Sequence, residues 1–222
     1  MAKKRLHTFQ ASVQRRHQFD EAMAFGQIYA GVDEVGRGCL AGPVVAAAVL
    51  PPADIASWEE VDDSKRLSET RRNALADLIR HTSPGFAVGL ADVSEIDELN
   101  ILKATQIAME RAVTALTAKV ELVLVDGIYP IHGNVASLPI VGGDHRSLTI
   151  AAASIVAKVY RDNYMKTLDK VYPGYGFAQH VGYGTKQHLA ALHELGVTEV
   201  HRRSFAPVQE ASSRQLELVL NG

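Results

Sequence analysis

Apolar positions along the chain form two patterns, short apolar or alternating runs and longer runs with helical spacing. The short runs predict five β-strands, at residues 28–35, 44–50, 85–93, 122–125 and 138–141. The longer runs predict helices at 13–25, from Ser68 through Ile79, from Ser94, and at 101–118, 148–172, 186–195 and 207–220. This order of elements predicts an α/β fold in which helices flank a mixed five-stranded sheet.

Acidic residues stand where several of these apolar runs stop. They are Asp33 and Glu34 in the first strand, Asp126 after the fourth and Asp144 before the long helix. If the first and fourth strands are parallel neighbours, the four carboxylates converge at one edge of the sheet. Side chains of successive strand residues point to opposite faces, so Asp33 and Glu34 share a pocket only if the strand ends or bulges there.

Four converging carboxylates repel one another and are stable when cations neutralise them. Two divalent ions about 4 Å apart can activate water and stabilise the leaving oxygen of a phosphodiester. Gly36-Arg37-Gly38 follows directly, and arginine and open backbone amides bind phosphate or sugar oxygens. Each piece also has a purely structural interpretation: a solvated turn at Gly36–Gly38, an ordinary turn at Asp126-Gly127 and a helix cap at Asp144.

Length and composition exclude several classes of protein. The chain has 222 residues, enough for one large domain or one domain with a small appendage, and no apolar run reaches membrane-spanning length. A single cysteine, Cys39, excludes an intrachain disulfide and a multi-cysteine zinc site. The net charge of −2 argues mildly against a general nucleic-acid binder, although basic pairs are scattered along the chain. These features indicate a cytoplasmic protein.

The motifs together resemble ribonuclease HII, the type 2 ribonuclease H family of bacteria. The resemblance covers residues 28 to about 207, in the same order as in the family. It rests on Gly31-Val-Asp-Glu-Val-Gly-Arg-Gly38 with Ala41-Gly-Pro-Val44, Asp62-Asp-Ser-Lys-Arg-Leu67, Asp126-Gly127, Gly143-Asp144, Ala151–Val159 with Arg161-Asp162, Gly182-Tyr-Gly-Thr-Lys186 and His201-Arg-Arg-Ser-Phe205.

The resemblance implies a ribonuclease H-like sheet with a small helical C-terminal appendage. The expected divisions are a leader at 1–26, a catalytic domain at 27–172 and the appendage at 173–222. It also implies an endonuclease with two Mg²⁺ or Mn²⁺ ions. Such an enzyme would cut the RNA strand of RNA–DNA hybrids and cut 5′ of single ribonucleotides in duplex DNA, leaving 3′-hydroxyl and 5′-phosphate ends, in ribonucleotide removal.

The resemblance assigns roles residue by residue. Asp33, Glu34, Asp126 and Asp144 match the metal-binding carboxylates. Gly36, Arg37 and Gly38 match the loop that senses the ribose 2′-hydroxyl, the group that distinguishes RNA from DNA. Tyr183 matches the tyrosine that stacks on the sugar 3′ of the ribonucleotide; Ser64 and Lys65 match phosphate contacts. Lys186 and Arg203 are either phosphate contacts or helix-end charges, and His180, His188 and His201 are interpreted as structural, since magnesium prefers oxygen ligands.

Two other functions stay open from the sequence. One is an inert nucleic-acid-binding module with the same fold, which loss of a carboxylate would favour, although all four are present. The other is a two-metal phosphatase or nucleotide hydrolase that acts on small substrates. We expect a monomer.

The C-terminal segment Gln215–Leu220 resembles the hexapeptide by which proteins bind the bacterial DNA sliding clamp. A glutamine is followed by leucines at Leu216, Leu218 and Leu220, a period of two that suits an extended peptide better than a helix. The alternative is the end of an amphipathic helix.

Overall fold

The computed structural model describes residues 2–61, 64 and 67–220, and the side chains among them from residue 11 to 214. The chain divides into two compact units, each described here by itself. The first unit comprises Met1–Val35, Val45–Leu90 and Gln106–Val159; the second comprises Gly36–Val44, Ala91–Thr105 and Tyr160–Gly222. The predicted boundaries at 26/27 and 172/173 stay a prediction.

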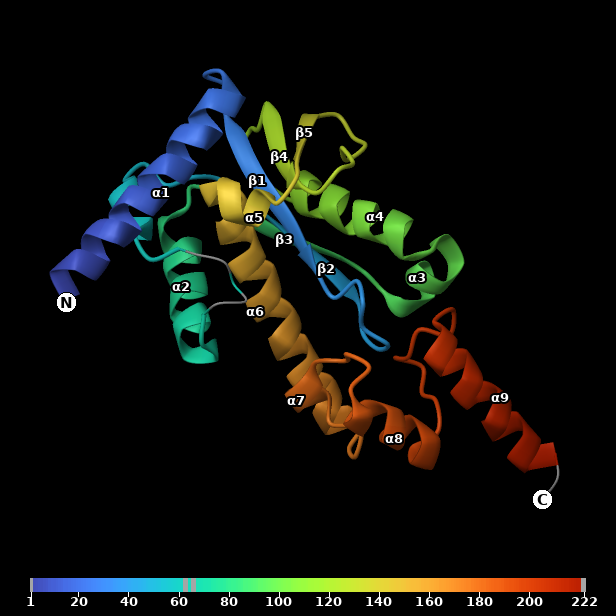
Figure 1. The fold of residues 1–222 in the computed structure, drawn as a ribbon. Helices are drawn as coiled ribbons and strands as arrows, with labels where there is room; N and C mark the ends of the chain where they lie inside the picture. The colour runs from blue at the N-terminus through green and yellow to red at the C-terminus, as the bar shows by residue number, and fades with distance from the viewer. Residues whose placement is uncertain (1, 62–63, 65–66, 221–222) are drawn as a thin grey trace. The chain divides into compact units, whose positions relative to one another are not determined.

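The described elements alternate as the sequence pattern predicts (Figure 1). They are α1 (Ala2–Ala24), β1 (Tyr29–Val35), β2 (Val44–Val49), a short 3₁₀ helix (Ile55–Trp58), α2 (Glu69–Thr82), β3 (Phe86–Ala91), α3 (Val93–Leu99), α4 (Ile101–Thr114), β4 (Leu122–Asp126), β5 (Ala136–Ile140), α5 (Gly143–Arg146), α6 (Leu148–Val171), α7 (Phe177–His180), α8 (Lys186–Leu195) and α9 (Ala206–Leu220).

The five strands form one mixed sheet with the order β3-β2-β1-β4-β5. β1 and β2 pair antiparallel, with Asp33 opposite Ala47, because Gly36 to Pro43 form a short connection. β1 and β4 pair in parallel, with Val32 opposite Val125, and β4 and β5 also pair in parallel. The predicted fold class is therefore confirmed, and the neighbouring parallel strands meet the condition on which the predicted acidic cluster depended.

The core of the first unit lies between the sheet and α1, α2 and α6, while α4 covers the opposite face (Figure 1). Two glycines permit this close packing. A Cβ at Gly31 would lie 2.3 Å from the backbone of Thr149 in α6, and one at Gly89 would lie 2.2 Å from the carbonyl of Ala108 in α4. The alanine-rich start of α6 serves the same purpose, since Ala151, Ala152 and Ala153 are fully buried.

The structure confirms some of the predicted helix boundaries and shifts others. Ser68 caps α2, accepting a hydrogen bond from the amide of Arg71, and α8 has the predicted bounds. The helix predicted at 101–118 ends at Thr114. The helix predicted at 207–220 is confirmed, since α9 runs from Ala206 to Leu220, so in the unbound chain the alternating leucines belong to a helix and the extended clamp-binding form stays a prediction.

The second unit has its own apolar core. Met165, Tyr175, Phe177 and Ala191 pack with Ala41, and a second small cluster joins Leu40 to Leu192 and Val208. Tyr175 and Phe177 stack with ring centroids 5.4 Å apart. In the described part of the chain, no helix is long and apolar enough to cross a membrane.

Candidate functional site

Asp33 lies at the point where β1 meets α6 in the first unit. The parallel register places Val32 opposite Val125, so Asp33 and Asp126 are the next residues of neighbouring strands. The side chain of Asp33 is 6% exposed. It accepts a hydrogen bond from the amide of Glu34 at 2.7 Å and another from the hydroxyl of Ser154 in α6. The sheet and α6 together therefore place a carboxylate in a largely dry position.

The electrostatic setting of Asp33 disfavours its charge. Burial raises the pKa of this carboxyl well above its usual range, and the charges of Glu34 and Asp126 raise it further, against smaller opposing effects of its hydrogen bonds. An acid in this setting becomes a stable anion when a cation is bound beside it. Oxygen ligands of this kind suit a hard divalent ion such as Mg²⁺ or Mn²⁺.

Glu34 is the one carboxylate that the strand geometry directs elsewhere. β1 stays paired through Val35, with Glu34 opposite Ala46, so the strand neither ends nor bulges at Asp33. Side chains therefore alternate there, and Glu34 leaves the face that Asp33 occupies. Within the described residues, no group of three or more histidine, cysteine, aspartate or glutamate side chains is placed to hold one metal ion. Asp33 and Asp126 are thus brought together, with the charge of Glu34 acting on Asp33 from the next position.

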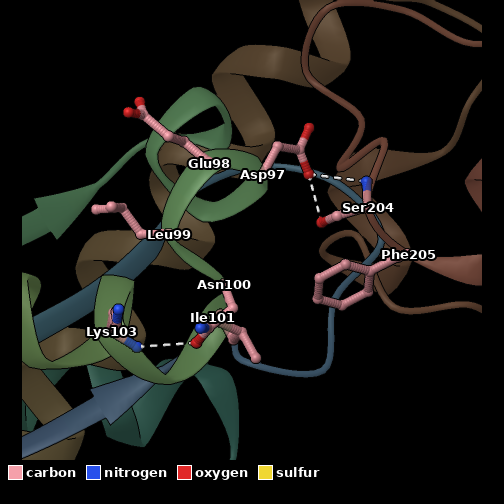
Figure 2. A pocket seen from close by; sticks show the side chains of 8 residues that line it. All are labelled: Asp97, Glu98, Leu99, Asn100, Ile101, Lys103, Ser204 and Phe205. Carbon is pink, nitrogen blue, oxygen red and sulfur yellow. Dashed lines mark hydrogen bonds between the residues drawn. The ribbon is translucent and has the colours of Figure 1, made fainter.

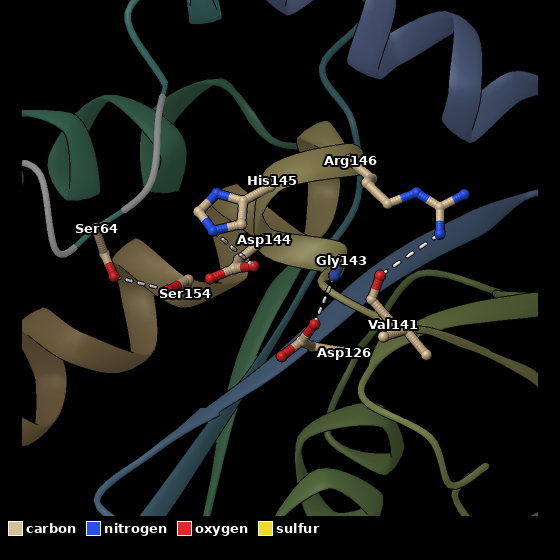
Figure 3. A network of polar contacts seen from close by, with 8 residues as sticks. All are labelled: Ser64, Asp126, Val141, Gly143, Asp144, His145, Arg146 and Ser154. Atoms are coloured by element: carbon tan, nitrogen blue, oxygen red, sulfur yellow. Dashed lines mark hydrogen bonds and ion pairs between the residues drawn. The ribbon is translucent and has the colours of Figure 1, made fainter.

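Asp126 and Asp144 are linked through the start of α5 (Figure 3). The Asp126 carboxylate accepts a hydrogen bond from the amide of Gly143 at 2.6 Å, and Asp144 is the next residue. Asp144 is buried, and its carboxylate lies 3.9 Å from the imidazole of His145. Gly143 fits this corner because a Cβ there would lie 2.5 Å from Ile150. One backbone amide thus holds Asp126 against the segment that carries Asp144.

Ser64 also belongs to this neighbourhood, through a residue that the sequence analysis gave no role. Its hydroxyl is buried and lies 2.8 Å from the hydroxyl of Ser154 (Figure 3). Ser154 in turn donates to Asp33. The carbonyl of Ser64 accepts a hydrogen bond from Arg72 in α2. The neighbouring Asp62, Asp63, Lys65 and Arg66 of the predicted motif lie outside the described residues.

In the second unit, two buried arginines hold the Gly36–Pro43 segment by its carbonyl oxygens. Arg161 donates to Pro43, Val181 and Ala41 at 3.0, 2.8 and 3.1 Å. Arg202 donates to Gly42 and Arg37 at 3.0 and 2.9 Å. Both side chains are fully buried. Sequence reasoning missed these roles, although both arginines belong to motifs that carried the resemblance.

The two glycines beside Arg37 serve different purposes. Gly36 has φ +94°, and a Cβ there would lie 2.2 Å from Nε of Arg161, so the fold itself requires glycine. Gly38 meets nothing within 4 Å, so its missing side chain leaves an exposed backbone that another molecule can approach. Arg37 and Gly38 are exposed. Together they form a held loop that presents an arginine and open backbone.

Tyr183 and Lys186 lie on the segment that leads into α8. Tyr183 is 43% exposed, while its backbone forms an isolated antiparallel bridge with Cys39. Lys186 is the first residue of α8, and Arg203 precedes α9. Cations at the N-terminal end of a helix are not stabilised by the helix dipole. The structure therefore removes the helix-end explanation for both residues and leaves the phosphate contact as a prediction.

A pocket of about 450 Å³ lies elsewhere in the second unit, beside the end of α3 and the start of α4 (Figure 2). Two of its polar side chains, those of Asp97 and Asn100, are engaged in hydrogen bonds to nearby backbone amides. The carboxylate of Asp97 accepts hydrogen bonds from the amides of Arg203 and Ser204 and from the hydroxyl of Ser204. The side-chain oxygen of Asn100 accepts from the amides of Leu102 and Lys103. The hydrogen bonds of Asp97 hold the segment before α9 against the end of α3, so we interpret this pocket as structural.

The family model and the curated relatives both indicate one family. The family model described as ribonuclease HII matches residues 30–208. A ribonuclease HII from Listeria monocytogenes is 50% identical over 182 residues, which are 82% of this chain and 69% of that protein. The ribonuclease H2 structure from Pyrococcus horikoshii is similar in fold, with a TM-score of 0.70 at 24% identity, covering 84% of this chain and 97% of that one.

A structure of a PCNA:RNase HII complex from Archaeoglobus fulgidus matches with a TM-score of 0.67 at 27% identity, covering 79% of this chain and 93% of that one. The family-model match spans the strands and helices that carry Asp33, Asp126, Asp144 and Tyr183. On this evidence the chain belongs to the ribonuclease HII family and is a ribonuclease H hydrolase.

Proposed function

We propose that this protein is a metal-dependent endonuclease that cuts the RNA strand of RNA–DNA hybrids and cuts 5′ of single ribonucleotides in duplex DNA. The observation that carries the proposal is the buried Asp33, which lies beside Asp126 on neighbouring parallel strands. Two neighbouring buried carboxylates repel each other, and a bound cation neutralises that repulsion, so the arrangement suits a metal site. The expected products have 3′-hydroxyl and 5′-phosphate ends.

Asp33, Asp126 and Asp144 would hold two divalent ions, Mg²⁺ or Mn²⁺, and Glu34, which starts from the opposite face of β1, would have to turn toward Asp33 to join them as the fourth carboxylate. When bound, the ions would supply an activated water and stabilise the leaving oxygen of the phosphodiester. The protein's own contribution is to fix the carboxylates: Ser154 donates to Asp33, and the amide of Gly143 donates to Asp126. The Ser64 hydroxyl, which precedes α2 in the chain, bonds the Ser154 hydroxyl and so helps to orient the donor to Asp33.

Residues of the second unit would recognise the substrate. Arg37, with the exposed backbone at Gly38, would sense the ribose 2′-hydroxyl and the phosphates beside it. Tyr183 would stack on the sugar 3′ of the ribonucleotide. Lys186, together with Ser64 and Lys65 of the first unit, would contact phosphates. The duplex is held mainly by its backbone in this scheme, which suits an enzyme that reads sugar chemistry and not base sequence.

One assay tests the proposal. A labelled DNA duplex with a single ribonucleotide is incubated with Mg²⁺, with Mn²⁺ and with chelator, beside an all-DNA duplex and a nucleotide triphosphate. We expect a single cut 5′ of the ribonucleotide, which chelator abolishes. Turnover of the triphosphate in place of the duplex would support a small-substrate hydrolase, and binding without cleavage would support an inert binding module.

The replacement Tyr183→Ala tests recognition of the ribonucleotide. Stacking of an aromatic ring contributes roughly 1–3 kcal/mol, so cleavage at a single ribonucleotide should fall about 5- to 150-fold. Cleavage within a continuous RNA–DNA hybrid should fall less, because the enzyme can choose among many ribonucleotides there. Initial rates on both duplexes measure the ratio. An equal loss on both would show that Tyr183 serves general binding or folding.

We also propose that Gln215–Leu220 binds a DNA sliding clamp. The structure from Archaeoglobus fulgidus contains a complex with PCNA, and this supports a test of the present chain against its own clamp. Because the backbone is helical to Leu220, binding by an extended peptide would require the last turns of α9 to unwind. A monomeric state and a cytoplasmic location remain predictions.

Surface-immobilised clamp provides the measurement for the tail. We expect the intact protein to bind and a version without residues 215–222 to lose at least about tenfold in affinity, roughly 1.4 kcal/mol. Cleavage of a short duplex in the absence of clamp should be unchanged by the truncation. Equal clamp binding by both versions, or none by the intact protein, would overturn the proposal.

A further inference from the structure

Three histidines surround the backbone of the segment that presents Tyr183. His180 lies in α7, His188 in α8 and His201 before α9, all within the second unit, and the last two are fully buried. His180 and His188 stack with ring centroids 4.6 Å apart, and His188 meets Phe177 edge to face at 5.4 Å. No step of the proposed function uses these side chains, although all three are buried in the second unit.

The hydrogen bonds of His201 and His188 permit one arrangement of protons. The amide of Thr198 can only donate, so Nδ1 of His201, 3.1 Å away, accepts and carries no proton, and the Thr198 hydroxyl, 2.8 Å from the same nitrogen, then donates to it as well. Neutral His201 then holds its proton on Nε2, which lies 3.1 Å from Nε2 of His188. Nε2 of His188 must accept, so its proton is on Nδ1, 3.0 Å from the carbonyl oxygen of Tyr183. A one-way relay thus runs from the Thr198 amide to the Tyr183 carbonyl.

His180 holds the same segment from the other side. Its Nδ1 accepts a hydrogen bond from the amide of Gly182, and its Nε2 donates to the carbonyl of Tyr175. The carbonyl of His180 accepts from the amide of Tyr183 at 2.9 Å. Every residue from His180 to Tyr183 is therefore fixed by its backbone, while Tyr183 remains 43% exposed.

The backbone conformation shows why this segment needs such support. Val181 has φ +45°, a left-handed conformation that a β-branched residue rarely adopts and that costs roughly 1–3 kcal/mol. Arg161 and Cys39 both donate to the carbonyl of Val181. Strain of this kind persists where surrounding contacts overdetermine it, and here it sets the direction in which the next residues leave α7.

We propose that His201 and His188 form a neutral hydrogen-bonded relay that positions Tyr183 for recognition of the ribonucleotide. The inference rests on the proposed function of Tyr183, and it makes both histidines positioning residues. Protonation of either ring would set two donors against each other, at Thr198 or between the rings. Burial lowers the pKa of His188 to about 4 and that of His201 to about 3, which keeps the relay intact at neutral pH.

Two replacements of His188 separate positioning from packing. The amide nitrogen of Asn occupies the place of imidazole Nδ1, so His188→Asn can still donate to the Tyr183 carbonyl. The longer Gln reaches toward His201 and removes the side-chain donor from that carbonyl, which keeps only the hydrogen bond from the Thr185 amide. Gln is closer to His in volume, so a side chain that only fills space would be replaced better by Gln than by Asn.

The readout is the ratio of cleavage at a single ribonucleotide to cleavage within a continuous hybrid. We expect His188→Asn to keep this ratio within about twofold of the unsubstituted protein, and His188→Gln to lower it at least about fivefold, the effect of one hydrogen bond. Equal ratios in both variants, or a greater loss with Asn, would overturn the proposal. His193→Gln, on the exposed side of α8, is the control and should leave the ratio unchanged.

A measurement without substrate separates failure of this inference from failure of the proposed function. Imidazole nitrogen NMR of the unsubstituted protein should show His188 protonated on Nδ1 and His201 on Nε2, both neutral from pH 5 to 8. Hydrogen exchange at the Tyr183 and Thr185 amides should accelerate in His188→Gln and not in His188→Asn. The opposite tautomer at His188, or titration within that range, would refute the relay even if the enzyme cuts as proposed.

Discussion

Asp33→Asn should reduce cleavage of a ribonucleotide-containing duplex by at least about a thousandfold, equal to about 4 kcal/mol of transition-state stabilisation. The replacement keeps the shape of the side chain and its hydrogen-bond acceptor for Ser154 and Glu34, but removes the charge that would hold a cation. Asp126→Asn should have a similar effect. Initial rates with saturating Mg²⁺ measure both. Cleavage within about tenfold of the unsubstituted protein would show that the metal site is elsewhere.

The matched control is Asp77→Asn, which removes the same charge from an exposed position on α2 in the same unit. Its cleavage rate should stay within about twofold, since exposed charges have small effects. The free energy of unfolding of Asp33→Asn, compared with that of the unsubstituted protein in chelator, adds a second readout. The pKa of Asp33 lies above its ordinary value of 3.8, so the folded state holds a proton that the unfolded chain has lost.

The sign of the pH effect follows from that proton. Without metal, the Asp33 carboxyl makes the folded state less stable as pH rises from its ordinary pKa of 3.8 through its raised value. Asp33→Asn cannot ionise and escapes this loss. In chelator, the variant's advantage in the free energy of unfolding should therefore grow with rising pH and vanish toward pH 3. Urea titrations at several pH values measure it, and an advantage that does not change with pH would contradict the raised pKa.

The sequence predicted the sheet well because its strongest signals are local. Runs such as Val44–Leu50 and Leu122–Val125 have the length and composition of buried strands, and bringing Asp33 of the first strand beside Asp126 of the fourth required only that these strands be parallel neighbours. The helix starting after Ser68 was equally readable, because its capping hydrogen bond is made within one turn.

What the sequence did not predict depends on contacts between distant residues. Ser154 lies 90 positions from Ser64, and Arg161 reaches carbonyls 118 and 120 positions away. Nothing in the local sequence around Ser154 or Arg161 indicates which distant residues they contact. The direction of Glu34 was open for a similar reason, since only the continued pairing of Val35 with Val45 shows that β1 does not end at Asp33.

Arg161 is the position where replacement should most strongly disturb the fold of the second unit. Its guanidinium is fully buried and satisfies the carbonyls of Ala41, Pro43 and Val181. Arg161→Met fills a similar volume but removes the guanidinium donor from all three carbonyls, of which Val181 keeps only the thiol of Cys39, and each buried acceptor left unpaired costs about 1–3 kcal/mol. Since the surroundings can relax, we expect a loss of about 3–5 kcal/mol in the free energy of unfolding.

Urea denaturation compares Arg161→Met with Lys170→Met, which removes an exposed cation from the last turn of the same helix. The control should lose less than about 1 kcal/mol, the contribution of a charge at a helix C-terminus. Hydrogen exchange locates the effect: the Leu40 and Gly42 amides, bonded to the carbonyls of Gly182 and Val200, should lose protection only in Arg161→Met. If both variants unfold alike, the segment that presents Arg37 is held by its own turns, and Arg161 is not the residue that fixes it.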